Sequence, residues 1–506
     1  MIVPVTTVSQ PGLVQDVPAH RMALSGWSDV RNVRFALNGV RTVEGYKDTF
    51  ILESTIMALF PIREQIVAMT LTGAFRLDGD ILTSIGRPSP YTGSDIDYWM
   101  GGVFNNWLVV TNGVDVPQVL DTNSLGIFSD MPAWPGARRA KVIRPFREFL
   151  IALGVSDSGT YDMRRVKWST PADPGTLPAS WDHTDPAVEA GELSLGEGSD
   201  IIVDGVQMQD EFFIFTAQQT WAMRYIGGQF IFSVAKVSDN TGLLAPGCFT
   251  DVPGAGLLIV TPSDIIVLGK GSIAEGTVRN EFFKRVDAQY YHRTRVLHLL
   301  DDNEVWIVFP ESGSSLLTLA YVWNYRLGVW SLIDIPTSRC AAARRGSLEV
   351  AVETIDSDSL TCDGESEILC DTGPGVIKYS RLVYFGYDGG AKEITPTENL
   401  SARLERTGIA YVGPEAIDEY SYKRALALRL DVTGGEGSVV MVTPGYQTSW
   451  STSPVWDTPI PYVIGQKEEV QFSVVGRFIC VRFEWTDPSI AINGYVLEVV
   501  PLEQRL

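Results

Sequence analysis

Short apolar runs separated by turn residues dominate the hydrophobic pattern of this chain. Residues 210–239 contain two strand-like runs, a turn and a third run, and residues 256–272 and 304–336 repeat that arrangement. The runs are β-branched or aromatic and are bounded by Gly, Pro, Asn, Asp or Ser, which is typical of strands and turns. Helical periodicity is almost absent. The sequence therefore predicts an all-β protein.

Three earlier segments show the same strand–turn–strand pattern, at 65–80, 101–121 and 145–170. In the second of them an Asn-Gly turn is expected at Asn112–Gly113. The later units begin roughly 40 to 55 residues apart, which is the repeat length of four-stranded propeller blades. A weaker unit at 377–395 would be a further or closing blade. We predict a β-propeller of six to seven blades, and an irregular array of stacked hairpins is the alternative.

The two ends of the chain do not follow this rhythm. Residues 1–45 mix Pro and polar residues with short apolar runs, as expected of an arm followed by an edge strand. Residues 398–506 read as a separate β-sandwich-like domain, with strand patterns such as that of 469–487. The propeller is then expected to span 46–397, with an acidic, turn-rich surface loop inserted near 356–375.

Composition narrows the classes of function. The chain has 506 residues, a formal net charge of −21 and a pI near 4.7, with 45% hydrophobic residues. Binding to a phosphate backbone over a broad surface requires clustered Lys and Arg, so such nucleic-acid binding is not expected, and neither is peripheral binding to anionic membranes. The beginning of the chain lacks a basic stretch followed by an apolar run, and no apolar stretch approaches a membrane span. Synthesis in a cytosol is expected.

No catalytic constellation is visible in the sequence. The five cysteines include no CxxC pair and suit thiols in a reducing compartment. His292 and His298 do not form a zinc motif, no GxSxG is present, and "GKGSIAEG" at 269–276 matches a phosphate loop only loosely. Carboxylates at Asp356, Asp358, Asp363 and Glu365 miss the EF-hand spacing, and whether they bind calcium is left open. We predict no enzyme activity, no cofactor and no metal site.

Several phrases resemble the tail hub or nozzle proteins of short-tailed, double-stranded DNA bacteriophages. The opening 11–46 is similar to their amino-terminal arm, with a Trp-Ser-Asp-x-Arg-Asn-Val-Arg-Phe core. Segments 164–182 and 190–228 resemble blade segments, and 322–336 resembles a phrase that ends in x-Trp-Ser. The stretch 476–501 resembles carboxy-terminal sandwich strands of phage tail proteins. Each match is degenerate, and their order and spacing carry the resemblance.

The resemblance implies a structural role in the virion tail. It implies a homo-oligomeric ring, commonly a hexamer, beneath the head-to-tail adaptor, in contact with other tail proteins such as a needle, plug or fibre. The ring would retain packaged DNA and conduct it at ejection without specific binding. Six copies would multiply the charge of −21 six-fold. We expect part of that acidity to face the channel, where it would repel phosphates at short range.

The arm at 1–45 is a candidate surface for assembly, because apolar anchors stand in a polar, Pro-containing context. The candidate docking residues are Leu13, Val17, Met22, Leu24 and Trp27. The alternative is that the arm forms an edge strand within its own subunit. Two other functions stay open from the sequence: a carbohydrate-active or carbohydrate-binding propeller acting on the host surface, and a prophage-encoded scaffold propeller.

Overall fold

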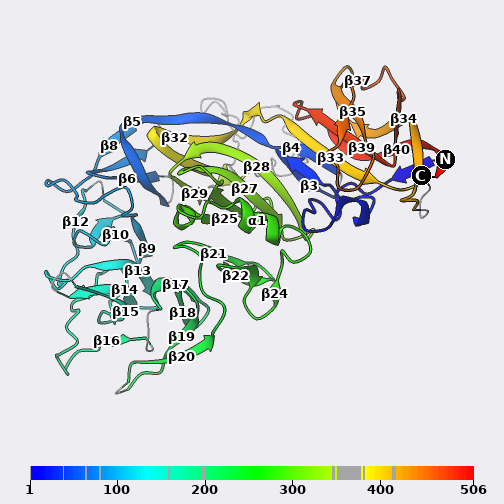
Figure 1. Ribbon diagram of the computed structural model, residues 1–506. Helices are drawn as coiled ribbons and strands as arrows, with labels where there is room; N and C mark the ends of the chain where they lie inside the picture. The colour runs from blue at the N-terminus through cyan, green and yellow to red at the C-terminus, as the bar shows by residue number, and fades with distance from the viewer. Residues whose placement is uncertain are drawn as a thin grey trace, which may run out of the picture.

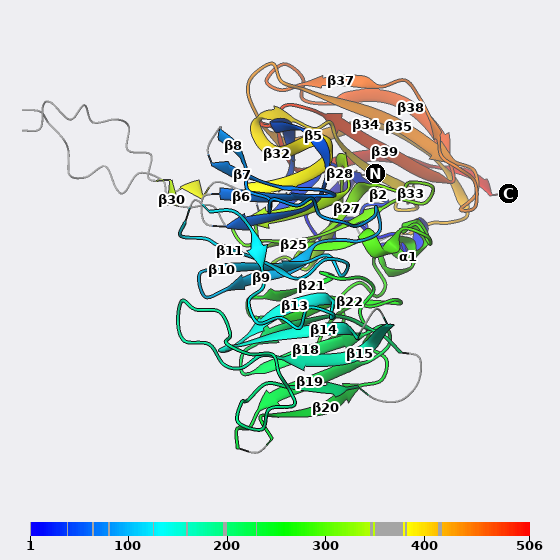
Figure 2. The same cartoon turned by 90° about the vertical axis from the view of Figure 1, so that its left-hand side faces the viewer.

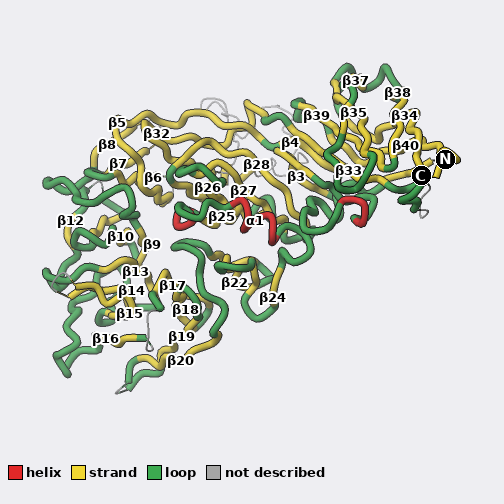
Figure 3. Tube along the Cα trace, viewed as in Figure 1, coloured by secondary structure: helices red, strands yellow, loops and turns green. Residues whose placement is uncertain are grey.

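A computed structural model of the chain describes residues 2–37, 39–62, 65–78, 81–124, 126–157, 160–195, 200–228, 230–344, 348–349, 378–379, 382–412 and 417–505. Almost all regular structure in this part of the chain is β, as Figure 3 shows. The helical elements are α1 (Arg279–Arg285) and two 3-10 turns at Ala19–Arg21 and Tyr291–Arg293. The predicted all-β class is confirmed, and α1 is too short to leave a helical period in the sequence.

Five antiparallel sheets of four strands follow one another along the middle of the described chain. They are β9 (Met100–Phe104), β10 (Trp107–Thr111), β11 (Gln118–Asp121) and β12 (Ser129–Asp130); β13 (Ala140–Phe146), β14 (Phe149–Asp157), β15 (Thr160–Trp168) and β16 (Gly191–Ser194); β17 (Ile202–Met208), β18 (Glu211–Thr216), β19 (Thr220–Tyr225) and β20 (Phe232–Ser238); β21 (Phe249–Val252), β22 (Gly256–Val260), β23 (Ile265–Val267) and β24 (Gly271–Ser272); β25 (Arg295–Leu299), β26 (Glu304–Pro310), β27 (Leu317–Asn324) and β28 (Val329–Ser338). The strand–turn–strand units expected from residue 101 to residue 336 fall in these blades, whereas the unit at 65–80 falls in the sheet described next.

A sixth sheet joins the two ends of this array. Its order is β29 (Cys340–Arg344), β32 (Leu382–Asn399), β5 (Glu44–Ile62), β6 (Gln65–Thr70), β7 (Ala74–Asp78) and β8 (Ile81–Ser84). The register runs antiparallel from Asn399↔Glu44 to Asp388↔Thr55. Because β32 follows the last blade and β5 precedes the first, this ladder closes the array. A two-stranded sheet, β30 (Leu348–Glu349) and β31 (Lys378–Tyr379), completes the region.

The blades are arranged as a β-propeller, which confirms the predicted architecture (Figures 1 and 2). First strands of successive sheets lie side by side, as β9 does with β13 and β25 with β29. Apolar side chains fill the space between neighbouring sheets: Phe146 and Phe212 join two blades at a ring distance of 5.5 Å, and Phe215 and Phe249 join the next two at 6.0 Å. Face-to-face burial of this kind is the main stabilising term of the wheel.

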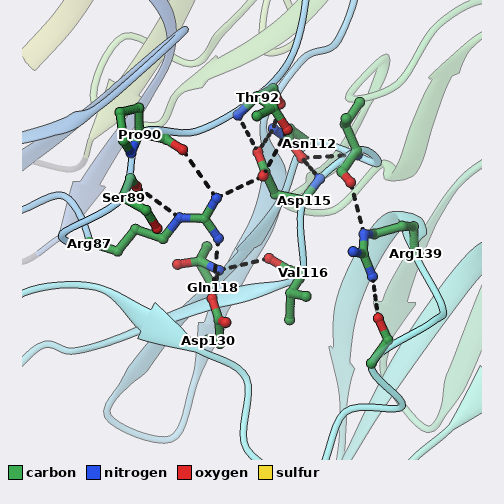
Figure 4. Close-up of polar contacts among 12 residues, drawn as sticks. Arg87, Ser89, Pro90, Thr92, Asn112, Asp115, Val116, Gln118, Asp130 and Arg139 are labelled. Carbon is green, nitrogen blue, oxygen red and sulfur yellow. Dashed lines mark hydrogen bonds and ion pairs between the residues drawn. The ribbon is translucent and has the colours of Figure 1, made fainter.

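A network of polar contacts ties the segment between β8 and β9 to the turn between β10 and β11 (Figure 4). The Asp115 carboxylate accepts hydrogen bonds from Arg87 Nη2, the Thr92 amide and Asn112 Nδ2, each at 2.8 Å. Asn112 Oδ1 in turn accepts from the amides of Val114 and Asp115, at 3.0 and 2.8 Å. The predicted turn at Asn112 is therefore present as an Asx turn that also anchors the neighbouring loop.

The second unit is a β-sandwich of two sheets that takes strands from both ends of the chain. One sheet holds β3 (Val33–Ala36), β4 (Gly39–Thr42), β40 (Ala491–Arg505), β34 (Ser421–Thr433) and β38 (Val470–Gly476), with β1 (Ile2–Val5) paired to β40. The other holds β2 (Asp29–Arg31), β33 (Ala402–Ile409), β39 (Phe478–Trp485) and β35 (Val439–Gln447), with β36 (Val455–Trp456) and β37 (Ile460–Val463) both paired to β35. The predicted sandwich-like domain is thus present, and it includes strands of the amino-terminal segment.

One lysine in the sandwich, Lys423, is buried and forms no ion pair with a carboxylate of the described residues. Lys423 Nζ donates to the carbonyl oxygens of Ser421 and Arg477, at 3.0 and 2.7 Å. Burial lowers the pKa of Lys423 to about 8, against the opposing effect of Asp418. Below that pH the Lys423 ammonium is charged in the folded protein, and burying this charge costs stability because water would solvate it better.

This lysine predicts a pH dependence of stability. The unfolded chain keeps the Lys423 proton up to the ordinary pKa of 10.5, whereas the folded chain releases it near 8. Stability contributed by this site therefore rises with pH between 8 and 10.5. We compare the free energy of unfolding of Lys423→Met with that of the wild type, measured in urea at two pH values. The difference should favour the variant more at pH 7, where the buried lysine is charged, than at pH 10. The exposed Lys467→Met serves as control, and an equal difference at both pH values would contradict the prediction.

Candidate functional site at the propeller–sandwich junction

The Trp-Ser-Asp-x-Arg-Asn-Val-Arg-Phe stretch at 27–35 lies where the propeller meets the sandwich. Trp27 is buried: its indole Nε1 donates to the carbonyl oxygen of Val8 at 2.8 Å, and its ring meets Phe483 edge-on at 6.0 Å. Phe483 belongs to β39, so this ring ties the arm to the sandwich. The tryptophan supplies the apolar anchor from which the polar residues of the stretch reach outward.

Ser28 and Asp29 bind the sandwich strand β33. Ser28 Oγ donates to the Glu405 carbonyl at 2.9 Å and accepts from the Thr407 amide at 3.0 Å. The Asp29 carboxylate pairs with the Arg403 guanidinium. These contacts extend the pairing of β2 with β33, in which Asp29 lies opposite Glu405.

Arg31 and Asn32 reach in the other direction, to the propeller strand β28. Arg31 Nη1 and Asn32 Nδ2 donate to the two carboxylate oxygens of Asp334, at 2.8 and 2.9 Å, and Asn32 Oδ1 accepts from the Asp334 amide at 2.8 Å. Asn32 has a φ of 55°, a left-handed conformation that Asn tolerates better than most residues. The bend at Asn32 therefore turns the chain so that its side chain meets Asp334.

Arg34 forms the most heavily charged contact of the junction. Its guanidinium donates to Glu304 at 2.8 Å and to Glu44 at 3.0 Å, and lies 3.3 Å from Asp302. Burial opposes the charge of Arg34, but the carboxylates of Glu304, Asp302 and Glu44 outweigh it, and the pKa of Arg34 is raised. Glu304 also accepts from the indole of Trp306 at 2.9 Å. One cation thus joins sandwich strand β3 to blade strand β26.

The arm that precedes this stretch is threaded between blades and sandwich. The Leu13 amide donates to the Trp330 carbonyl at 2.9 Å, and Gln15 Oε1 accepts from the Tyr321 hydroxyl at 2.7 Å. Gly12 has a φ of 76°, and a Cβ there would lie 2.9 Å from Val329 Cβ, so only glycine fits this close approach. The Asp16 carboxylate accepts from two amides at the start of α1.

Arg406 holds the turn of the arm against the sandwich. It is fully buried in β33, and its guanidinium donates to the carbonyl oxygens of Ala19 at 2.8 Å, Met22 at 3.2 Å and Ala23 at 3.4 Å. In the described part of the chain the hydrogen-bond partners of this side chain are all carbonyl oxygens. Burial lowers the pKa of the Arg406 guanidinium.

The five residues predicted to dock on a neighbouring subunit occupy different environments in this one. Leu13, Met22 and Trp27 are buried within their own chain, and Val17 and Leu24 are half-buried. Leu13 and Trp27 belong to the apolar core of the subunit and Leu24 packs against it, as the intrachain alternative expects. Docking of the arm on another subunit stays a prediction.

A groove of about 820 Å³ runs along the arm at this junction. Val17 lines it, together with arginines that each contact a carboxylate: Arg285 lies 2.9 Å from Glu281, and Arg482 lies 2.8 Å from Glu405. Burial raises the pKa of Glu405 against the opposing effect of Arg482. The groove therefore presents charged side chains that are paired with one another, which suit polar contacts.

The structure describes some of the other residues considered in the sequence. Within the described residues, His20 lies against Trp450 and Phe478, at ring distances of 5.9 Å, and His298 lies beside Tyr325. The described residues contain no group of three or more His, Cys, Asp or Glu placed to hold a metal. Asp356, Asp358, Asp363 and Glu365, with the acidic loop 356–375, lie outside the described residues.

The burial of three cysteines predicts that their thiols react slowly. Cys248, Cys340 and Cys480 are buried thiols, and burial raises the pKa of each to about 12. At pH 8 their thiolate fraction is about a thousandfold below that of an ordinary thiol. Mass-spectrometric mapping after N-ethylmaleimide treatment should find these three unmodified in the native protein and modified in 6 M guanidinium, a conventional denaturing level. Rapid native labelling of any of the three would contradict this.

Comparison with known proteins adds little to the fold. No protein-family model matches the chain, and no curated protein matches it. Among solved structures, the chain is similar to the WD40 β-propeller domain of Doa1, with 9% identity, a TM-score of 0.36, and coverage of 69% of this chain and 96% of that one. It is also similar to the computationally designed Ika8 protein, with 10% identity, a TM-score of 0.35, and coverage of 76% and 98%.

A third similar structure is the N-terminal domain of Nup159, with 11% identity, a TM-score of 0.28, and coverage of 67% of this chain and 75% of that one. TM-scores this low carry no information on function. No helix in the described segments is long and apolar enough to cross a membrane. The chain's own fold and junction define its class: a β-propeller protein with an attached β-sandwich.

Proposed function

We propose that this chain is a structural subunit of a short bacteriophage tail, a hub or nozzle protein that forms an oligomeric ring beneath the head-to-tail adaptor. In this role the ring retains packaged DNA and conducts it at ejection. Its contacts are with further copies of itself, the adaptor and other tail proteins, and it catalyses no reaction. The location is the virion tail, after synthesis in the host cytoplasm.

One observation carries the proposal. Three of the phrases that resemble phage tail proteins lie far apart in the sequence but meet at the junction: Asn32, from the first phrase, is bonded to Asp334, from the phrase 322–336. Trp27 packs on Phe483, from the phrase 476–501. Residues of these three phrases thus take part in the contacts at the junction of propeller and sandwich.

A rigid junction suits the wall of a pressurised tail. Domains joined by a small polar interface move relative to each other by default. Here the arm is hydrogen-bonded to both units, strands from both chain ends build the sandwich, and Arg34 joins the two by buried ion pairs. These contacts oppose hinge motion between the two units, which suits a ring around packaged DNA.

The charge supports the same role. A subunit with a net charge of −21 repels phosphates over about 8 Å at physiological ionic strength. DNA can then pass a wall of such subunits without adhering to it. Which carboxylates face the channel stays a prediction.

The proposal is tested by locating the protein in phage particles. An antibody raised against the purified chain should place gold label on the tail directly below the head, in electron micrographs of a phage that encodes it. Label on long fibres, or on no particle, would contradict the proposal. Release of oligosaccharides from host surface glycans by the purified protein would replace it with a carbohydrate-active propeller.

A further inference from the structure

The imidazole of His183 lies between two charged groups at the outer edge of one blade. It belongs to the connection from β15 to β16, the last two strands of their sheet. Its Nδ1 lies 3.3 Å from Lys167 Nζ, and its Nε2 lies 3.3 Å from Glu192 Oε1. Lys167 and Glu192 stand opposite each other in the β15–β16 register and form an ion pair at 3.3 Å. The imidazole thus contacts a cation and an anion of the same blade.

These two contacts fix the protonation state of the imidazole. An ammonium only donates hydrogen bonds, so Nδ1 accepts from Lys167 and the ring proton is left on Nε2, where it faces the Glu192 carboxylate. A second ring proton would place an N–H on Nδ1 against the Lys167 ammonium. Lys167 is buried, so water does not screen the repulsion that would follow. The contact therefore requires a neutral His183.

Two further charged groups face the imidazole. Arg138, from the segment before β13, also pairs with Glu192, so two cations share that carboxylate. Asp182, the neighbour of His183 in the chain, is exposed. Partial burial lowers the pKa of His183, and the charges of Lys167 and Arg138 lower it further. The carboxylates of Glu192 and Asp182 oppose this shift without cancelling it.

His183 fastens an exposed stretch, residues 182–187, to the blade. On one side of this stretch Trp181 is buried in the blade. On the other side Trp168 Nε1 donates to the carbonyl oxygen of Glu189 at 2.9 Å. The other hydrogen bonds that the structure describes for the stretch join residues of the same connection to one another. Between its two ends, the stretch is therefore held to the blade through the imidazole.

We propose that His183 is an acid-sensitive latch, which holds the stretch 182–187 on the blade at neutral pH and releases it in acid. In the detached stretch the imidazole binds a proton near its ordinary pKa of 6.5, whereas the docked imidazole resists protonation. Docking therefore loses stability as the pH falls through 6.5. Release uncovers the Lys167 and Glu192 side chains at the edge of the blade. The latch goes beyond the proposed structural role and does not depend on it.

Hydrogen exchange of the full chain at pH 5.5 and pH 8.0, corrected for the intrinsic rate at each pH, measures the opening of the stretch. The opening equilibrium of the wild type should be up to about tenfold larger at pH 5.5, the limit for one group with a pKa of 6.5 in the detached state. His183→Gln can accept from Lys167 and donate to Glu192 without titrating, so it should stay closed at both pH values. His183→Arg is charged at both and should be open at both.

A second histidine provides the control. His298, in β25, also has a pKa lowered by burial, and His298→Gln should keep the wild-type response of the stretch. Amides of β14 should be equally protected in every variant, which shows that the blade stays folded. Equal opening of the wild type at both pH values, or acid opening of His183→Gln as large as that of the wild type, would overturn the inference. Either result would leave the proposed function standing.

Discussion

Replacing Arg406 with Met should lower the free energy of unfolding by about 3–5 kcal/mol, a cost typical of breaking a buried charged network. The methionine keeps much of the side-chain volume but leaves the carbonyl oxygens of Ala19, Met22 and Ala23 without their donor. The arm turn should then detach from the sandwich.

Urea unfolding measures the loss, and hydrogen exchange locates it. Amides of residues 19–23 should exchange faster in the variant, while those of the distant blade strand β14 should not change. Arg424→Met, at an exposed position of the sandwich strand β34, is the matched control and should alter stability by less than about 0.5 kcal/mol. Equal stability of the Arg406 variant and the wild type would show that the hydrogen bonds from Arg406 to the carbonyl oxygens of the arm do not contribute to stability.

Replacing Arg34 with Met should cost a similar amount, about 3–5 kcal/mol, because it leaves buried carboxylates without a counter-charge. Glu304 is 2% exposed and Asp302 4%, so water cannot take over the role of the guanidinium. The variant should have a lower free energy of unfolding, and its sandwich should be held less firmly against the propeller. Arg41, exposed opposite Arg34 in the β3–β4 ladder, provides the control variant Arg41→Met.

A double-mutant cycle isolates the ion pair. Glu304→Gln keeps an acceptor for the Trp306 indole but removes the charge. The double variant Arg34→Met with Glu304→Gln should lose less than the sum of the single losses, with a coupling energy of about 1–3 kcal/mol. Strict additivity would mean that Arg34 acts through packing alone.

The fold class could be predicted because each blade is built locally. Strands such as β6 and β7, or β26 and β27, pair with their sequence neighbours across short turns, so their period and turn residues lie within one window of sequence. The Asn112 turn shows this: its side chain bonds to the backbone two and three residues on. Local rules suffice where the contacts are local.

The make-up of the sandwich and the junction could not be predicted in the same way. Ile2 pairs with Glu498, and Asp29 lies opposite Glu405, so the partners are hundreds of residues apart. No local pattern encodes such a pairing. No local pattern marks Arg34 or Arg406 as buried, and their burial between distant strands gives them their role. The one feature of the sequence that indicates the junction is the high density of polar residues in 27–35 beside apolar anchors.

The claim that copies of this rigid two-domain subunit surround a channel is tested most directly by imaging the purified protein. Two-dimensional class averages from negative-stain electron microscopy should show closed rings, commonly of six copies, with a central opening. Particles that remain single propellers with one sandwich at every concentration, or that assemble only into open filaments, would contradict it.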